Sequence, residues 1–82
     1  MAGPTHELFH EIADPACAAL RSAVVALGLK ERIAFRNVAY PEALADLRAR
    51  GGEGVPALWD GGRLHVGPVA IGEELARLGA EG

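Results

Sequence analysis

The sequence predicts an α/β fold in which the elements follow the order βαβαββα and form a four-stranded mixed sheet flanked by helices. Two observations carry this prediction. Short apolar segments alternate with segments of helical periodicity, and Asp60-Gly61-Gly62 has the composition of a tight hairpin turn. A strand, a helix and a second strand form a parallel pair with a right-handed crossover, whereas a hairpin adds an antiparallel pair. At 82 residues, the chain (1–82) is expected to be a single domain.

The first half of the chain is expected to hold a strand over residues 7–12 and then a helix. Asp14 and Pro15 predict where the helix begins. The aspartate side chain can accept free amide hydrogens of the first turn, and a proline at the first helical position gives up no needed donor. Gly28 is its expected end. Its buried face is marked by residues at three- and four-residue spacing: Cys17, Leu20, Val24 and Leu27.

The second half is expected to hold three strands and two helices. Residues 32–38 alternate between apolar and polar side chains, as a half-buried strand does. A second helix over 41–50 opens on a proline. Residues 55–59 and 63–66 are the predicted hairpin strands, and a last helix is predicted over about 70–78. The expected inward residues of these helices are Leu44 and Leu47, and then Ile71, Leu75 and Leu78.

Charge and composition exclude several classes of function. The net charge is −3 and the eight basic residues are scattered singly, so nucleic acid is not an expected partner. No apolar run approaches the ~20 residues that span a bilayer, and the N-terminal stretch lacks the pattern of a signal peptide. We therefore expect a cytoplasmic protein that does not bind a membrane. A single cysteine forms no internal disulfide and supports no dithiol cycle.

Three short motifs follow one another along the chain: DPAC at 14–17, GVPAL at 54–58 and DGGRLHVG at 60–67. Together they resemble the thioredoxin-like superfamily, most closely the glutaredoxins and the related N-terminal domain of glutathione transferases. DPAC stands where glutaredoxins carry C-P-Y-C, GVPAL where the family has its cis-proline, and DGGRLHVG where the family has its final hairpin. The resemblance covers essentially the whole chain, and it implies a thioredoxin-like fold with a cis bond before Pro56.

The residues that depart from this pattern stand at the positions that carry the chemistry of the family. Asp14 stands at the position of the nucleophilic cysteine and cannot exchange with a disulfide, while Cys17 stands at the position of the resolving cysteine. Glu11 replaces the lysine that pairs with a glutathione carboxylate. The polar pair that holds the other end of glutathione is missing after Gly67. The resemblance therefore implies that dithiol activity and most charged contacts to glutathione are lost.

A backbone binding groove could persist, because the residue before the cis-proline offers its amide and carbonyl to an extended ligand in this family. The predicted ligand is a peptide, a partner protein or a small thiol. Glutathione remains a candidate without its charged contacts, and no other cofactor is expected. The groove residues would be Asp14, Pro15, Ala16, Val55, Pro56 and Gly67.

Other hypotheses stay open. Cys17 could serve a monothiol redox enzyme or sensor that forms mixed disulfides, and DPAC followed by Arg21 also has some likeness to the single-cysteine arsenate reductases of the superfamily. The simpler interpretation makes Cys17 a small buried apolar residue and Asp14 a helix cap without catalytic duty. A third hypothesis is a remnant of a larger enzyme system that keeps only the fold.

The three histidines, His6, His10 and His65, have no metal-ligand spacing with one another or with Cys17, so no metal site is predicted. They are expected to be solvated or partly buried. Trp59 is expected in the core or in a partial surface patch, and full exposure would indicate a partner surface.

Overall fold

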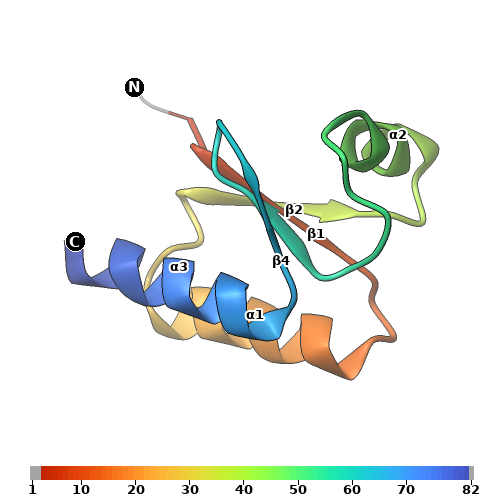
Figure 1. Cartoon of the computed structure of the whole chain (residues 1–82). Coiled ribbons are helices and arrows are strands. Elements are labelled where there is room, and N and C mark those ends of the chain that lie inside the picture. The colour runs from red at the N-terminus through yellow and green to blue at the C-terminus, as the bar shows by residue number, and fades with distance from the viewer. Residues whose placement is uncertain (1–2, 82) are drawn as a thin grey trace.

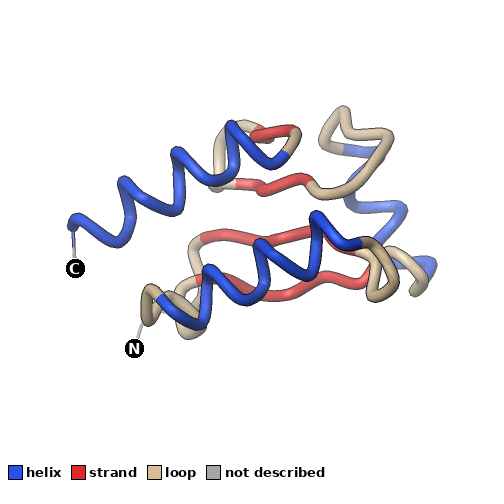
Figure 2. The backbone as a smooth tube through the Cα atoms, turned by 90° about the horizontal axis from the view of Figure 1, so that it is seen from below, coloured by secondary structure: helices blue, strands red, loops and turns tan. Residues whose placement is uncertain are grey.

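The structure is a computed structural model that describes residues 3–81. It holds a four-stranded mixed sheet with α1 and α3 on one face and α2 on the other (Figures 1 and 2). The order of elements is the predicted one, βαβαββα. The elements are β1 (His6–His10), α1 (Pro15–Ala26), β2 (Ile33–Asn37), α2 (Pro41–Ala49), β3 (Ala57–Trp59), β4 (Leu64–Val66) and α3 (Pro68–Glu81).

The strand order in the sheet is β2-β1-β3-β4. The first two strands are parallel, as the strand-helix-strand prediction required, and Leu8 lies opposite Phe35. β3 pairs antiparallel with both β1 and β4. Asp60 closes the hairpin as predicted. Its amide donates to the carbonyl of Arg63, and its side chain accepts from the amides of Gly62 and Arg63.

Several boundaries differ from those predicted. β1 ends at His10 rather than at residue 12, because its last partner in the sheet is Asn37, the final residue of β2. The carbonyls of Glu11 and Ile12 instead accept hydrogen bonds from Arg21. β3 begins at Ala57 rather than at 55, because Pro56 has no amide hydrogen to donate to a strand ladder.

The boundaries of β4 and of the last helix also differ from the predicted ones. β4 begins at Leu64, one residue later than predicted. α3 begins at Pro68, two residues before the predicted start, since a proline in the first turn of a helix needs no hydrogen-bond donor. It also runs three residues past the predicted end, to Glu81.

Two apolar clusters fill the space between the sheet and its helices. The cluster under α2 is small and centres on Phe9, Leu47 and Ala57. The larger cluster lies under α1 and α3 and includes the predicted inward residues of α3. Its members are Leu8, Leu20, Val24, Leu29, Ile33, Leu58, Ile71, Leu75 and Leu78.

Leu27 and Leu44 depart from the predicted buried faces. Leu27 is 46% exposed, because α1 ends at Ala26 and the chain reverses at Gly28, whose φ of +71° only glycine adopts readily. Leu44 is only half-buried, and Ala43 takes its place beside Leu47 in the buried face of α2. No helix within residues 3–81 is long and apolar enough to cross a membrane.

Candidate functional site

The predicted groove residues lie where β1 ends and β3 begins, a region that we call the β1 end. The sheet register places them there, because Phe9 pairs with Ala57 and Ala57 pairs with Val66. The amide of Gly67 also donates to the carbonyl of Pro56 at 3.2 Å. In Figure 1, the turn before α1, the start of β3 and the turn before α3 all lie at this end of the sheet. The β1 end comprises Asp14, Pro15, Ala16, Val55, Pro56 and Gly67.

Asp14 caps α1, as its place in the sequence predicts. Its side chain accepts a hydrogen bond from the amide of Cys17 at 2.9 Å, and Pro15 occupies the first helical position. The hydrogen bond from Cys17 is the main reason that the pKa of Asp14 lies below its usual value. The carboxylate is therefore ionised at neutral pH and is engaged with the backbone of its own helix.

Cys17 lies on the buried face of α1 and has no exposed surface. Burial raises the pKa of its thiol, and the neighbouring carboxylate of Asp14 raises it further, although a backbone hydrogen bond with Glu11 and the charge of Arg21 act in the opposite direction. A reactive cysteine needs both access and a stabilised thiolate. Cys17 has neither in this structure.

Val55 and Pro56 are joined by a cis peptide bond, as the resemblance implies. Pro56 is buried, whereas Val55 is half-buried. The backbone N–H and C=O of Val55 make no hydrogen bond with any other residue of the part of the chain described here. Backbone groups of this kind normally find a partner, and at a surface that partner is water or a ligand.

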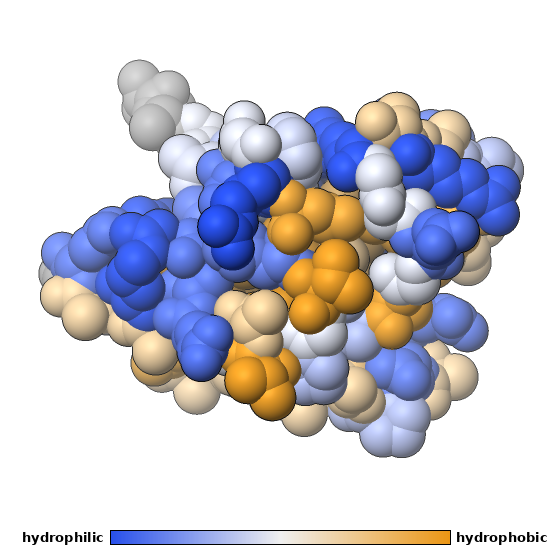
Figure 3. Space-filling model, in the orientation of Figure 1, coloured by the Kyte–Doolittle hydropathy of each residue, from blue (hydrophilic) through white to orange (hydrophobic). Residues whose placement is uncertain are grey.

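Exposed apolar side chains lie next to the β1 end. Ile12 is 62% exposed in the turn before α1, Val66 is 62% exposed at the end of β4, and Val69 is 77% exposed in the first turn of α3. Apolar surface gathers over β4 and the start of α3 in the space-filling view (Figure 3). This apolar rim consists of Ile12, Val66 and Val69.

Two hollows of the described surface are lined by none of the residues of the β1 end. One hollow is lined by Arg48, Gly51, Gly52 and Glu53, and another by Arg21, Ser22, Val25, Ala26 and Phe35.

The histidines are more buried and better paired than predicted. His6 and His10 are both buried, the first against Glu74 and the second against Arg21. Burial, with a smaller contribution from Arg21, lowers the pKa of His10 below its usual value.

The aromatic ring of Trp59 is half-buried, and the side chain of Arg50 lies over it. The guanidinium of Arg50 lies 4.8 Å from the centre of the indole ring, and the ring packs against the small apolar cluster under α2. The prediction of a core or partial surface position is confirmed.

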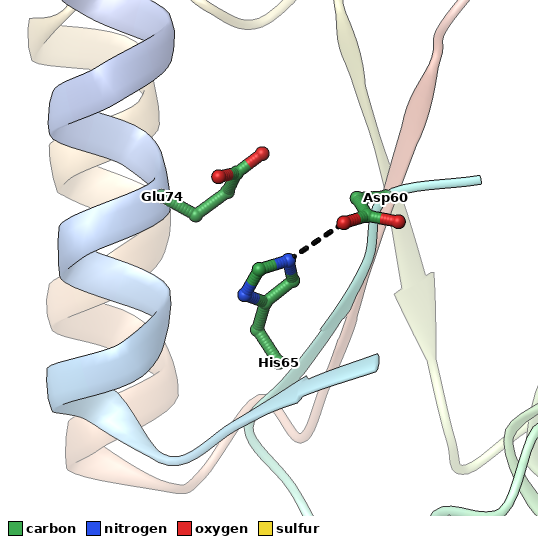
Figure 4. Close-up of side chains that lie close together, drawn as sticks. All are labelled: Asp60, His65 and Glu74. Atoms are coloured by element: carbon green, nitrogen blue, oxygen red, sulfur yellow. Dashed lines mark hydrogen bonds and ion pairs between the residues drawn. The ribbon is translucent and has the colours of Figure 1, made fainter. Parts of the chain in front are cut away.

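A second cluster of side chains, which sequence spacing did not reveal, lies at the other end of β3. Asp60, His65 and Glu74 come from the hairpin turn, β4 and α3, and one nitrogen or oxygen atom of each lies within 4.8 Å of the others (Figure 4). We call these three residues the hairpin cluster. His65 Nε2 donates to Asp60 Oδ2 at 2.8 Å. The spacing along the chain follows no ligand motif, because the hairpin and the following helix bring the residues together.

Both carboxylates of the hairpin cluster are held in the ionised state. The hydrogen bond from His65 and those from its own turn place the pKa of Asp60 well below its usual range. The hydrogen bonds from Arg77, with a smaller one from His6, lower the pKa of Glu74 to about 2. The cluster therefore carries two negative charges at neutral pH, and the neighbouring Arg77 carries one positive charge.

No protein-family model, curated protein or solved structure matches the chain. What is established is a small α/β domain with a mixed four-stranded sheet and three helices, an architecture compatible with a thioredoxin-like fold.

Proposed function

We propose that the chain is a glutaredoxin-like, thioredoxin-like domain that has lost dithiol chemistry and binds an extended peptide or a segment of a partner protein at the β1 end. The observation that carries the proposal is that the backbone N–H and C=O of Val55, beside the apolar rim, make no hydrogen bond within residues 3–81. The motif order DPAC, GVPAL and DGGRLHVG supports the family assignment.

The binding would use two kinds of contact. An extended peptide would donate one backbone hydrogen bond to Val55 and accept another from it, as in the addition of a strand to a sheet edge. Main-chain bonds of this kind give affinity with little dependence on sequence. Ile12, Val66 and Val69 would then select apolar side chains on the peptide, because their burial on binding removes apolar surface from water.

The competing function is thiol-disulfide exchange through Cys17 as a monothiol. Exchange requires the sulfur to be attacked or to attack as a thiolate, and therefore to reach another sulfur atom. Cys17 is fully buried, and the pKa of its thiol is raised. These two observations favour binding over catalysis at the β1 end.

The proposal is tested by backbone amide NMR during titration with a blocked apolar pentapeptide, Ac-Ala-Val-Leu-Val-Ala-NH2. We expect the amide signals of Val55 and Gly67 to shift, and we expect the same peptide with a methylated leucine amide to bind more weakly. Val69→Ser should weaken binding about fivefold, since about 1 kcal/mol of apolar burial is removed.

A matched control is Val25→Ser, because Val25 is a similarly exposed valine on α1, away from the β1 end. This variant should bind the peptide as the parent does. The proposal fails if millimolar peptide leaves the signals of Val55 and Gly67 unchanged, or if Val25→Ser weakens binding as much as Val69→Ser. Reduced and oxidised glutathione, titrated in the same way, show whether glutathione is a ligand.

A further inference from the structure

We propose that Asp60, His65 and Glu74 form a binding site for a divalent transition-metal ion of the zinc type. The site is separate from the β1 end and does not depend on the function proposed there. Its three side chains come from three successive elements and converge on a shared space beside α3 (Figure 4).

The distances suit an ion of this size. Zinc lies about 2.1 Å from nitrogen and oxygen ligands, so tetrahedral ligands lie about 3.4 Å from each other. The candidate ligand atoms here lie within 4.8 Å of one another. Closing the widest pair therefore needs a shift of at most about 1.4 Å, shared between side chains that rotate about their own bonds.

Asp60 is a fixed ligand with one acceptor position left. Its Oδ1 accepts from the amides of Gly62 and Arg63 at 2.8 and 2.7 Å, and its Oδ2 accepts from His65 at 2.8 Å. A carboxylate has about four lone pairs, so about one remains, on Oδ2. The backbone bonds of the turn hold the carboxylate in place before any ion arrives, which lowers the cost of ordering it.

The carboxylate of Glu74 is likewise held in place by hydrogen bonds. Its Oε1 accepts from Arg77 Nε at 2.8 Å, while its Oε2 accepts from His6 Nε2 at 3.0 Å and from a second nitrogen of Arg77 at 2.6 Å. About one lone pair therefore remains, on Oε1. Hydrogen bonds to ligating carboxylates are a normal feature of metal sites, where they orient the ligand. The Arg77 side chain is 55% exposed and can also move aside.

His65 determines the class of metal. Its Nε2 faces Asp60 Oδ2, and the ion would take the place of the proton that now lies between the two atoms. That proton moves to Nδ1 of the ring or to solvent, and no electron is transferred. An imidazole favours zinc and its transition-metal neighbours, whereas magnesium and calcium prefer oxygen ligands alone. Water fills the remaining coordination position.

The experiment is calorimetric titration of Zn²⁺ into chelator-treated protein carrying Cys17→Ala, because a free thiol is itself a zinc ligand. We expect one ion per chain with a dissociation constant in the micromolar range or below. His65→Gln, Asp60→Asn and Glu74→Gln should each weaken binding at least about tenfold. The imidazole nitrogen signals of His65 should shift on addition of Zn²⁺, and those of His10 should not.

Two controls outside the cluster keep the test specific. His10→Gln removes a histidine, and Asp46→Asn removes a carboxylate that pairs with Arg36. Both should bind Zn²⁺ as the Cys17→Ala protein does, and circular dichroism verifies that every variant is folded. The proposal is overturned if the dissociation constant for Zn²⁺ is above 0.1 mM (~5.5 kcal/mol). It is also overturned if a folded His65→Gln protein keeps its affinity, or if His10→Gln loses it.

Discussion

The two ends of β3 differ in the kind of chemistry that they offer. The β1 end, where the resemblance places a redox centre, holds a carboxylate that caps α1 and lies next to the buried thiol of Cys17. It also holds the backbone groups of Val55, which have no partner within residues 3–81 and lie beside an apolar rim. The hairpin cluster, where no motif pointed, holds two ionised carboxylates and a histidine that converge. A motif indicates where the members of a family have their functional residues. The convergence of side chains in the structure shows which groups this chain itself can use. Four predictions test that contrast.

The largest effect is expected in the reactivity of Cys17. Because the thiol is fully buried and its pKa is raised, native protein at pH 7 should react with iodoacetamide about a thousandfold more slowly than the denatured chain, since reaction requires local opening. Mass spectrometry of timed aliquots, with and without denaturant, measures both rates. Native reaction as fast as that of free cysteine would support the monothiol function.

The next largest effect is expected for Glu74→Ala, measured by urea unfolding with a chelator present. Glu74 is buried against His6, and its removal leaves His6 Nε2 without its hydrogen-bond acceptor at a buried site, at a cost of about 2 kcal/mol. The matched control is Glu73→Ala at the adjacent exposed position, which should change stability by less than about 0.5 kcal/mol. Equal effects of the two variants would show that the pair contributes nothing.

A smaller effect is expected for Asp14→Ala, which removes the side-chain cap of α1 and should cost about 1 kcal/mol of unfolding free energy. Asp14→Asn keeps an oxygen acceptor and should retain stability within a few tenths of a kcal/mol. Urea unfolding of the two variants distinguishes a cap from a functional acid. If peptide binding at the β1 end is lost in a stable Asp14→Asn protein, the carboxylate has a role beyond capping.

The smallest effect concerns His10 and pH. Burial lowers the pKa of His10 in the folded protein, so the folded protein binds fewer protons at this site than the unfolded chain. Its contribution to stability is therefore present above pH 6.5 and is lost as the pH falls through 6.5 toward the folded pKa. Imidazole NMR titration should show protonation of His10 below pH 6.5. The dependence of the urea midpoint on pH over this range should be reduced in His10→Gln.

The local predictions succeeded where a residue acts on its own neighbours. Asp14 caps α1, Gly28 follows its end in the left-handed region, and Asp60 braces the hairpin, because each effect operates within a few residues. Some of the predictions that failed involve distant groups. β1 was expected to reach residue 12, but after His10 the carbonyls of Glu11 and Ile12 accept hydrogen bonds from Arg21, and nothing in the strand sequence itself indicates that contact.

The sequence by itself determined the order of the elements, the parallel and antiparallel pairing, the helix cap at Asp14 and the absence of a dithiol. Hydrophobic period, turn chemistry and cysteine count are properties of short stretches or of composition. Only the tertiary structure decided that Cys17 has no exposed surface, that the backbone groups of Val55 find no partner within residues 3–81 and that Asp60, His65 and Glu74 meet. Burial depends on the packing of the helices against the sheet, and the hairpin and α3 bring together residues that no spacing along the chain relates.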